Sequence, residues 1–94
     1  MLERTIKDAV KKRLKALGAY QLWPVQMGLG ETTVDCLACY KGQFFGIECK
    51  APGESPTLKQ NITLRQIQNA GGRILVIDRL EQIDEFLTAD TLSR

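Results

Sequence analysis

The amino-terminal segment repeats apolar residues at the spacing of an α-helix. Between Glu3 and Leu17, apolar side chains recur at every third or fourth position; they are Ile6, Val10, Leu14 and Leu17. A helix with 3.6 residues per turn collects these side chains on one face. Gly18 follows directly and tolerates the left-handed backbone conformation in which many helices end. The pattern therefore predicts an amphipathic helix over residues 3–17.

Two segments predict single β-strands. Residues 20–27 (YQLWPVQM) are rich in strand formers, but Pro24 has no backbone N–H to donate, so we expect this strand at an edge of a sheet. Residues 73–77 (RILVI) form a short and almost continuous apolar run. Such a run indicates a strand that is buried on both faces.

Two further strand-like segments predict a β-hairpin. Residues 34–40 and 43–50 are separated only by Lys41 and Gly42. A glycine in a two-residue connection permits the positive φ angle that a tight turn requires. We therefore expect the two segments to pair as antiparallel neighbours.

A second helix is predicted between the hairpin and the last strand. Thr57 is a favourable N-cap residue, and Gln60 stands three positions later, as in a capping box. The helix should run from Leu58 to about Ala70, where the glycines of the AGG segment (70–72) end it. Gln60 precedes the apolar residues of this helix by four and seven positions, so its side chain should point toward the sheet.

The end of the chain predicts one more helix. Residues 80–87 carry apolar side chains at helical spacing, and residues 88–94 are expected to be a fraying tail. The order of elements is then helix, three strands, helix, strand, helix. This order predicts an α/β fold: a single domain over residues 1–94 with a mixed sheet of about four strands flanked by helices.

Composition is that of an ordinary small globular domain. Of the 94 residues, 44% are hydrophobic and 26% are charged, which separates the chain from disordered and fibrous classes. A core of this size is modest, so association into a homodimer would add stability. No apolar run approaches the roughly 18 residues of a membrane span, and the charged start is unlike a signal peptide. We expect a cytoplasmic protein with no membrane partner.

The cysteines predict a reduced protein. Three cysteines without secretory features do not suggest a disulfide framework; they are Cys36, Cys39 and Cys49. Cys36 and Cys39 form a C-x-x-C pair, but the chain has no second pair and no histidine to complete a zinc site. We expect all three to be small buried hydrophobic residues.

The absence of histidine excludes two classes of catalysis. Neither a Ser-His-Asp triad nor a Cys-His pair can form, so any chemistry must use carboxylates, lysine or a metal ion. The net charge is only +2, but residues 1–15 hold six basic and two acidic side chains, whereas residues 78–94 hold two basic and five acidic ones. A phosphate backbone would be attracted to the first helix, although such a charge run is also typical of a solvated helix face.

Asp35, Glu48 and Lys50 have the strongest potential for chemistry. Side chains alternate along a strand, so Glu48 and Lys50 share one face of the second hairpin strand. A hairpin that turns at residues 41–42 pairs position 35 with about position 48. The two carboxylates would then lie about 5 Å apart and repel each other unless a cation lay between them.

Magnesium is the cation that this arrangement favours. It is commonly held by one or two carboxylates together with water and substrate phosphate. It would polarise the phosphate and lower the pKa of a bound water, while Lys50 could orient that water and stabilise the developing negative charge. The residues therefore predict phosphodiester hydrolysis with Mg²⁺ as cofactor and Mn²⁺ as a substitute.

These residues resemble the PD-(D/E)xK nucleases, and within them the small virus-type replication-repair nuclease domains known as VRR-NUC. The matching elements span nearly the whole chain and occur in the family's order: Glu3 in the first helix, Asp35, the strand ending Ile47-Glu48-Cys49-Lys50, TLKQ with Gln60, and AGG. The D…ExK part is unspecific alone, and the ordered set is much more specific. The resemblance implies a metal-dependent DNA endonuclease of replication or repair.

The resemblance also implies a role for each matching residue. Its metal ligands would be Asp35, Glu48 and the backbone carbonyl of Cys49, and its catalytic lysine would be Lys50. Glu3 is similar to the helix carboxylate that reaches the metal through water, and Gln60 to a glutamine that positions the site or the nucleophile. One departure is that the family often has Gly-x-Pro-Asp where this chain has Thr32-Thr33-Val34-Asp35, so the loop before Asp35 lacks both the glycine and the proline.

The resemblance implies partners as well. Stand-alone viral and bacterial members of the family resemble dimeric resolvases of branched DNA such as Holliday junctions, so the expected partners are junction DNA and a second copy of the chain. A virus-encoded protein acting in the host cytoplasm is compatible with this. Phosphate contacts are expected from Arg4, Lys7, Lys11, Lys12 and Lys59. The candidate dimer interface is the edge strand at residues 20–27, with Tyr20 and Trp23 as core or interface aromatics.

Each assignment has a simpler alternative. Glu48 and Lys50 could be an exposed pair on a half-solvated strand, Gln60 only a capping residue, and Glu3 only a favourable charge at a helix start. For the whole protein, the first alternative is a non-catalytic DNA-binding or assembly module of the same fold. The second is a nuclease that acts on simple duplex or single-stranded ends.

Overall fold

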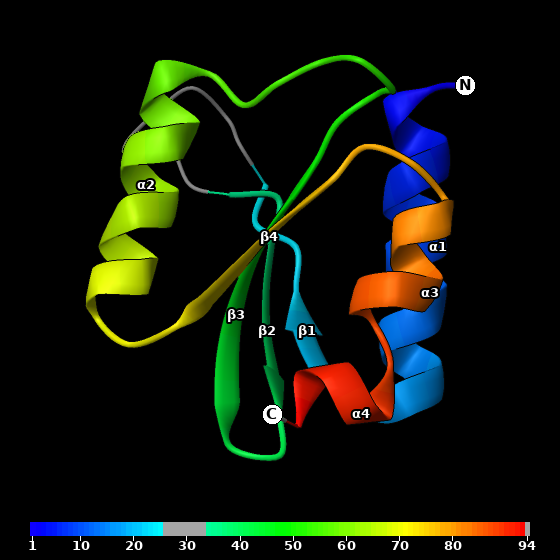
Figure 1. Cartoon of the computed structure of the whole chain (residues 1–94), viewed down its shortest axis with the longest axis vertical. Coiled ribbons are helices and arrows are strands. Elements are labelled where there is room, and N and C mark those ends of the chain that lie inside the picture. The colour runs from blue at the N-terminus through cyan, green and yellow to red at the C-terminus, as the bar shows by residue number, and fades with distance from the viewer. Residues whose placement is uncertain (26–33, 94) are drawn as a thin grey trace.

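A four-stranded sheet separates two layers of helices in the computed structural model, which describes residues 1–25 and 34–93 (Figure 1). The elements are α1 (Glu3–Leu17), β1 (Tyr20–Leu22), β2 (Cys36–Tyr40), β3 (Gln43–Cys49), α2 (Leu58–Asn69), β4 (Arg73–Ile77), α3 (Glu81–Phe86) and α4 (Ala89–Leu92). The strand order is β1-β2-β3-β4. Helices α1, α3 and α4 lie on one side of the sheet and α2 lies on the other. The predicted α/β class and the mixed four-stranded sheet are confirmed.

Helix α1 has the predicted bounds and buries the predicted face. Ile6, Val10 and Leu14 are buried against the sheet. Gly18 ends the helix with φ 79°, and its N–H bonds to the carbonyl oxygens of the last turn. The apolar repeat therefore positions both the helix and its charged side chains relative to the strands.

The hairpin of β2 and β3 also follows the prediction. Lys41 (φ 48°) and Gly42 (φ 82°) form its two-residue turn, and both positive angles suit the right-handed twist of the strands. Cys36 pairs with Ile47 in the antiparallel ladder. This register is the one predicted from the sequence, and its continuation by one residue brings position 35 opposite position 48. β4 then pairs with β3 in parallel.

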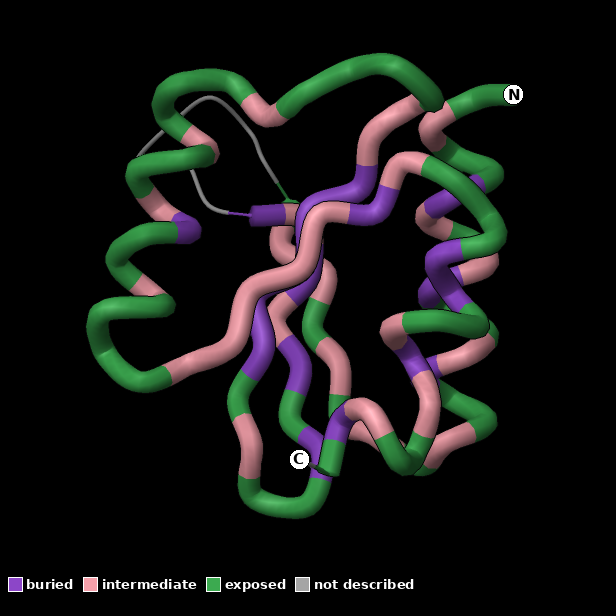
Figure 2. The backbone as a smooth tube through the Cα atoms, viewed as in Figure 1, coloured by how far each residue is buried: buried purple, intermediate pink, exposed green. Residues whose placement is uncertain are grey.

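The main core lies between the sheet and the layer of α1, α3 and α4 (Figure 2). Alternate residues of β3 point into it, and Phe45, Ile47 and Cys49 are almost fully buried. On the opposite face, Ile67 of α2 approaches Gly46 so closely that a Cβ atom at Gly46 would lie 2.6 Å from its Cδ1 atom. Gly46 therefore allows α2 to pack directly on β3.

Helix α2 leaves part of its own side of the sheet uncovered. Tyr20 and Leu22 of β1 are 69% and 48% exposed, and Phe44 of β3 is 46% exposed. These three side chains share that face with Cys39, which is also exposed. We call these four residues the open apolar face. The expectation that all three cysteines are buried is therefore wrong for Cys39, because it points away from the core in the alternation of β2, and it is confirmed for Cys36 and Cys49.

Two strand predictions need correction. The strand expected over residues 20–27 is an edge strand, but its described part ends at Leu22 because Pro24 cannot continue the ladder; residues 26 and 27 lie outside the described part of the chain. The strand at residues 73–77 was expected to be buried on both faces. It lies instead at the other edge of the sheet, and only Ile77 is fully buried. Its apolar run reflects helices packed on either side of it, α2 and α3.

The carboxyl-terminal segment is folded over residues 88–93, contrary to the prediction of a fraying tail. The Thr88 side chain accepts a hydrogen bond from the N–H of Thr91 and so caps α4. Leu92 is buried in the core, and Arg73 donates a hydrogen bond to the carbonyl oxygen of Thr91 (2.9 Å). The helix predicted over residues 80–87 corresponds to α3. None of the helices in the described ranges is both long enough and apolar enough to cross a membrane.

Candidate active site

The carboxylate of Asp35 is fixed by the end of the neighbouring strand. Asp35 directly precedes β2, and its Oδ2 atom accepts a hydrogen bond from the backbone N–H of Cys49 (2.8 Å). Its side chain is only 15% exposed. Oδ2 is therefore bonded to the protein backbone, while Oδ1 faces Lys7. The predicted proximity of Asp35 to the end of β3 is confirmed.

Glu48 is a buried acidic side chain beside Asp35. It lies in β3, paired in register with Val76 of β4, and is 1% exposed. Neither Oε1 nor Oε2 has a hydrogen-bond partner among the described residues. Burial raises the pKa of Glu48 to about 9; a hydrogen bond with Asp35, which the protonated form can donate, and the negative charges of Asp35 and Glu3 act in the same direction, and Lys50 opposes them. The alternative of an exposed ion pair on a solvated strand is wrong for this residue.

Lys7 bridges the first helix and Asp35. Its Nζ atom lies 3.3 Å from Oε2 of Glu3, one helical turn earlier, and 3.5 Å from Oδ1 of Asp35. Partial burial lowers the pKa of Lys7, but the charges of Asp35 and Glu3 outweigh this effect and the pKa is raised. Lys7 was expected to contact phosphate. In this structure its ammonium group instead pairs with two of the expected active-site carboxylates.

Lys50 stands at the end of β3, next to Glu48. It is half-buried, and its backbone N–H bonds to the carbonyl oxygen of Ile77 (2.9 Å). This bond continues the pairing of β3 and β4 and holds the chain at the position where the Lys50 side chain leaves the sheet. Four of the expected residues are thus brought together, namely Glu3, Asp35, Glu48 and Lys50, and Lys7 joins them.

Gln60 is held in a capping box. Its Oε1 atom accepts a hydrogen bond from the N–H of Thr57 (2.9 Å), and its own N–H donates to the Thr57 hydroxyl (3.2 Å). Gln60 is half-buried and lies on the face of α2 that contains Leu64 and Ile67, as predicted. The observed role of its side chain is that of a cap. A role at the carboxylates would require it to leave this position, so that role remains a proposal.

The remaining basic residues expected to bind phosphate are exposed. They are Arg4, Lys11, Lys12 and Lys59. Lys11 also lies over the ring of Trp23, with its Nζ atom 4.8 Å from the ring centre. Trp23 is half-buried and packs against the core, whereas Tyr20 belongs to the open apolar face. Helix α1 therefore carries a basic surface that begins next to the carboxylates.

The donor set fits a hard divalent cation with few protein ligands. Glu48 offers a carboxylate whose burial is otherwise uncompensated, and Asp35 offers a second one held in a fixed orientation. Within residues 1–25 and 34–93, no group of three or more His, Cys, Asp or Glu side chains is arranged to hold a metal ion. A cation here would complete its shell with backbone oxygen, water or phosphate, as Mg²⁺ commonly does.

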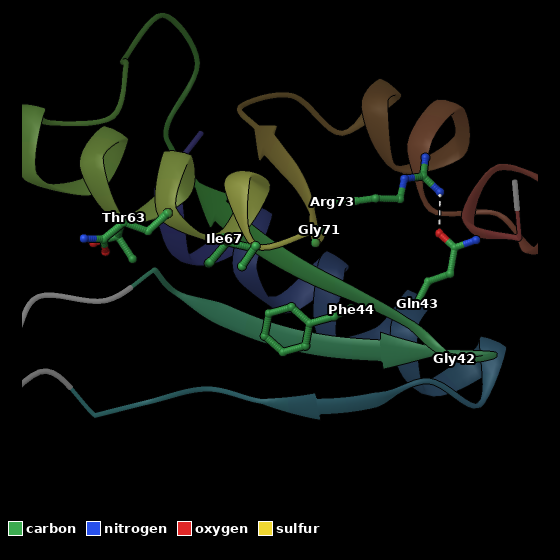
Figure 3. Close-up of a pocket in the computed structure, with 10 residues that line it drawn as sticks. Gly42, Gln43, Phe44, Thr63, Ile67, Gly71 and Arg73 are labelled. Atoms are coloured by element: carbon green, nitrogen blue, oxygen red, sulfur yellow. Dashed lines mark hydrogen bonds between the residues drawn. The ribbon is translucent and has the colours of Figure 1, made fainter.

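The most prominent pocket is separate from these carboxylates. Gln43 and Phe44 at the start of β3 line it, together with Ile67 near the end of α2 (Figure 3). Arg73 closes one side with a hydrogen bond to Gln43 (3.4 Å). Glu48 lies at the other end of β3. The carboxylate site and this pocket therefore lie at opposite ends of β3.

No protein-family model matches the chain, and a search of curated proteins finds no match. The interpretation of the site therefore depends on its own geometry. The sequence predicted that Glu3, Asp35, Glu48 and Lys50 would act at one site, and the structure brings them together; the pairing of Lys7 with Asp35 was not predicted. The spacing of Glu3 and Lys7 indicates a contact within one helix, but no pattern in the sequence relates α1 to the residue before β2.

Proposed function

We propose that this protein is a metal-dependent DNA endonuclease of the PD-(D/E)xK type, similar to the VRR-NUC domains. The observation that carries the proposal is Glu48: it is 1% exposed, lies beside the second acid Asp35 and, when ionised, has no hydrogen-bond donor among the described residues. A buried acid without a partner destabilises a folded protein. A divalent cation shared with Asp35 would remove this cost, and this supports a metal site at these two acids.

The proposed mechanism assigns one task to each side chain. Asp35 and Glu48, with the backbone carbonyl of Cys49, would hold the cation, and Glu3 would contact it through water. A bound Mg²⁺ or Mn²⁺ polarises a phosphate and makes its bound water more acidic. Lys50 would orient the attacking water and stabilise the negative charge that develops on the phosphate oxygens. Gln60, if it leaves its capping position, would help to position the nucleophile.

The proposed substrate is branched DNA. Arg4, Lys11, Lys12 and Lys59 would contact phosphates on both sides of the site, which predicts binding that weakens steeply with salt. A four-way junction has approximate two-fold symmetry, so paired nicks require two active sites related by a matching axis. A homodimer would supply them. Its interface could include the β1 edge or the open apolar face, since unpaired strands and exposed apolar patches favour association.

Cleavage assays with chosen variants test the proposal directly. Labelled four-way junction, fork, duplex and single-stranded DNA would be incubated with Mg²⁺, Mn²⁺ or EDTA. We expect junction nicking that requires the metal and falls by about 10²-fold or more in Lys50→Ala and Asp35→Asn, because both remove charge from the reacting centre. Lys15→Ala, at an exposed position at the other end of α1, is the matched control and should cut normally.

The assay also distinguishes the alternatives. If simple duplex or single-stranded ends are cut as well as the junction, the protein is a nuclease without selectivity for branched DNA. A specific observation favours the non-catalytic module: Asp35 is already satisfied by the N–H of Cys49 and by Lys7 without any metal. Folded protein that binds DNA equally well in EDTA and never cuts it would establish that alternative and overturn the proposed activity.

A further inference from the structure

The two oxygens of Asp35 have different partners. Oδ2 accepts a hydrogen bond from the backbone N–H of Cys49 at 2.8 Å, which fixes it relative to the end of β3. Oδ1 faces the ammonium group of Lys7 at 3.5 Å. The backbone bond fixes the orientation of the carboxylate. Oδ1 is therefore the oxygen that remains for a cation, and in this structure the cation beside it is Lys7.

Lys7 and a metal ion would compete for the negative charge at Oδ1. A metal ion in contact with a carboxylate oxygen lies about 2.1 Å from it, while Lys7 Nζ is 3.5 Å from the same atom. Two cations that share one carboxylate oxygen repel each other, and water screens this repulsion less in a partly buried site. Lys7 can move away, because its side chain is flexible and 32% exposed.

The geometry points to Lys7 as an internal cation that competes with a divalent ion for Asp35 and that the ion displaces on binding. This inference rests on the proposed function, since it concerns the same metal site. In the metal-free protein Lys7 neutralises Asp35 and Glu3. When the metal binds, the ammonium group is released next to the site at which substrate phosphate would bind. Lys7 then exchanges a carboxylate partner for a phosphate partner, which couples metal loading to DNA binding.

The first test is Mn²⁺ affinity, measured calorimetrically in the absence of DNA. Lys7→Met removes the charge but keeps a long side chain with similar helix propensity. Surface ion pairs of this kind contribute a factor of about two to five to an equilibrium constant. We therefore expect Lys7→Met to bind Mn²⁺ about two- to fivefold more tightly than the unaltered protein. Lys15→Met changes the net charge equally and should leave the affinity unchanged.

The second test is DNA binding in Ca²⁺, which is used here as a metal that keeps the site filled. Loss of one phosphate contact reduces the slope of log K against log salt concentration by about 0.9. We expect this reduction for Lys7→Met in Ca²⁺ and a smaller one in EDTA, where Lys7 pairs with Asp35. Circular dichroism and melting curves verify that each variant is folded.

The outcomes separate the inference from the proposed function. Equal or weaker Mn²⁺ binding by folded Lys7→Met, with the unaltered protein binding normally, would overturn the exchange and leave the metal site intact. If Lys7→Met reduces the slope of log K against log salt concentration equally in Ca²⁺ and EDTA, Lys7 does not exchange Asp35 for phosphate when the metal binds. Absence of Mn²⁺ binding by every protein, Lys7→Met included, would instead refute the proposed metal site, and the inference would fail with it.

Discussion

Glu48 determines how this site behaves without metal. Its side chain is 1% exposed and, when ionised, has no hydrogen-bond donor among the described residues, whereas the protonated form can donate to Asp35, so the folded state favours the protonated form. Lys50 lies nearby, yet burial and the neighbouring acids have the larger effect on the pKa of Glu48. At neutral pH the metal-free protein therefore retains a proton that a solvated glutamate would release.

This retained proton predicts a pH-dependent difference between the unaltered protein and Glu48→Gln in EDTA. The carboxyl group of the unfolded chain ionises near pH 4.5, and that of the folded chain near pH 9. Between these values the folded state binds the extra proton, so the free energy of unfolding falls as pH rises. Below pH 4.5 both states are protonated and the loss disappears. Glu48→Gln should be more stable than the unaltered protein by several kcal/mol at pH 8 and nearly equal to it at pH 4.5.

Urea unfolding at several pH values measures this difference. Glu54→Gln makes the same change at an exposed loop position and should leave the pH profile unchanged. Mn²⁺ should reverse the order at neutral pH, because it stabilises only a protein that binds it. A constant difference between Glu48→Gln and the unaltered protein across pH 4–9 would mean that the buried carboxyl group is not the titrating group.

At the scale of elements, the hairpin and the capping box were predictable because each is local. The turn at Lys41 and Gly42 fixes the register, and the register fixes which carboxylates meet. Thr57 and Gln60 satisfy each other's backbone N–H groups within one helical turn. In contrast, the Lys7–Asp35 pair depends on how α1 lies across the sheet, and the role of β4 as an edge strand depends on the strand order. No local pattern encodes either.

The capping box predicts a measurable stability loss. Thr57→Ala removes the hydroxyl that accepts the N–H of Gln60, which should lower the free energy of unfolding by about 1 kcal/mol and Tm by roughly 4–8 °C. Thr57→Ser keeps the hydroxyl and should retain most of the stability. Thermal melting of the three proteins measures the effect. A Thr57→Ala protein that melts like the unaltered one would show that the cap contributes nothing in solution.

Gln60→Glu separates the cap from the proposed catalytic role. Glutamate suits the same capping position and the positive end of the helix, so Tm should be maintained. The change removes the amide N–H₂ group, which is the only side-chain donor of Gln60. Nicking that persists in this variant would limit Gln60 to capping, and selective loss of nicking would support a second role near the carboxylates.

At the scale of the whole molecule, the two faces of the sheet are unequally covered. One face lies beneath α1, α3 and α4, while α2 covers only part of the other and leaves the open apolar face. The burial of Cys39 was mispredicted for this reason, since composition cannot tell which side of a strand a helix will cover. The folded segment at residues 88–93 was missed similarly, because Leu92 alone gives no helical periodicity.

The unequal coverage predicts that a single thiol is reactive. Cys39 is exposed, whereas Cys36 and Cys49 are buried and burial raises the pKa of both thiols. A thiol reagent should therefore modify about one group per native chain and about three in denaturant, because the thiolate is the reactive form. Mass spectrometry would locate the modification, with Cys39→Ser as the unreactive control.

The same labelling reports on the expected homodimer. If a second copy covers the open apolar face, modification of Cys39 should slow as the protein concentration rises through the dimerisation range. Rapid labelling of a protein shown to be dimeric by ultracentrifugation would place the interface elsewhere, for instance at the β1 edge outside this face. Rapid modification of Cys36 or Cys49 would contradict the described core.

The hairpin also has a consequence for the order of folding. Asp35 directly precedes β2 and Glu48 lies in β3; a two-residue turn joins these two strands, and such hairpins close within microseconds. Pairing of β3 with β4 needs the crossover through α2 and is a slower, less local event. The two acids thus meet while water still surrounds them, and their desolvation follows when β4 and α2 arrive. The unfavourable burial of these two acidic side chains should therefore occur late in folding, so we expect it to have little effect on the rate of hairpin formation.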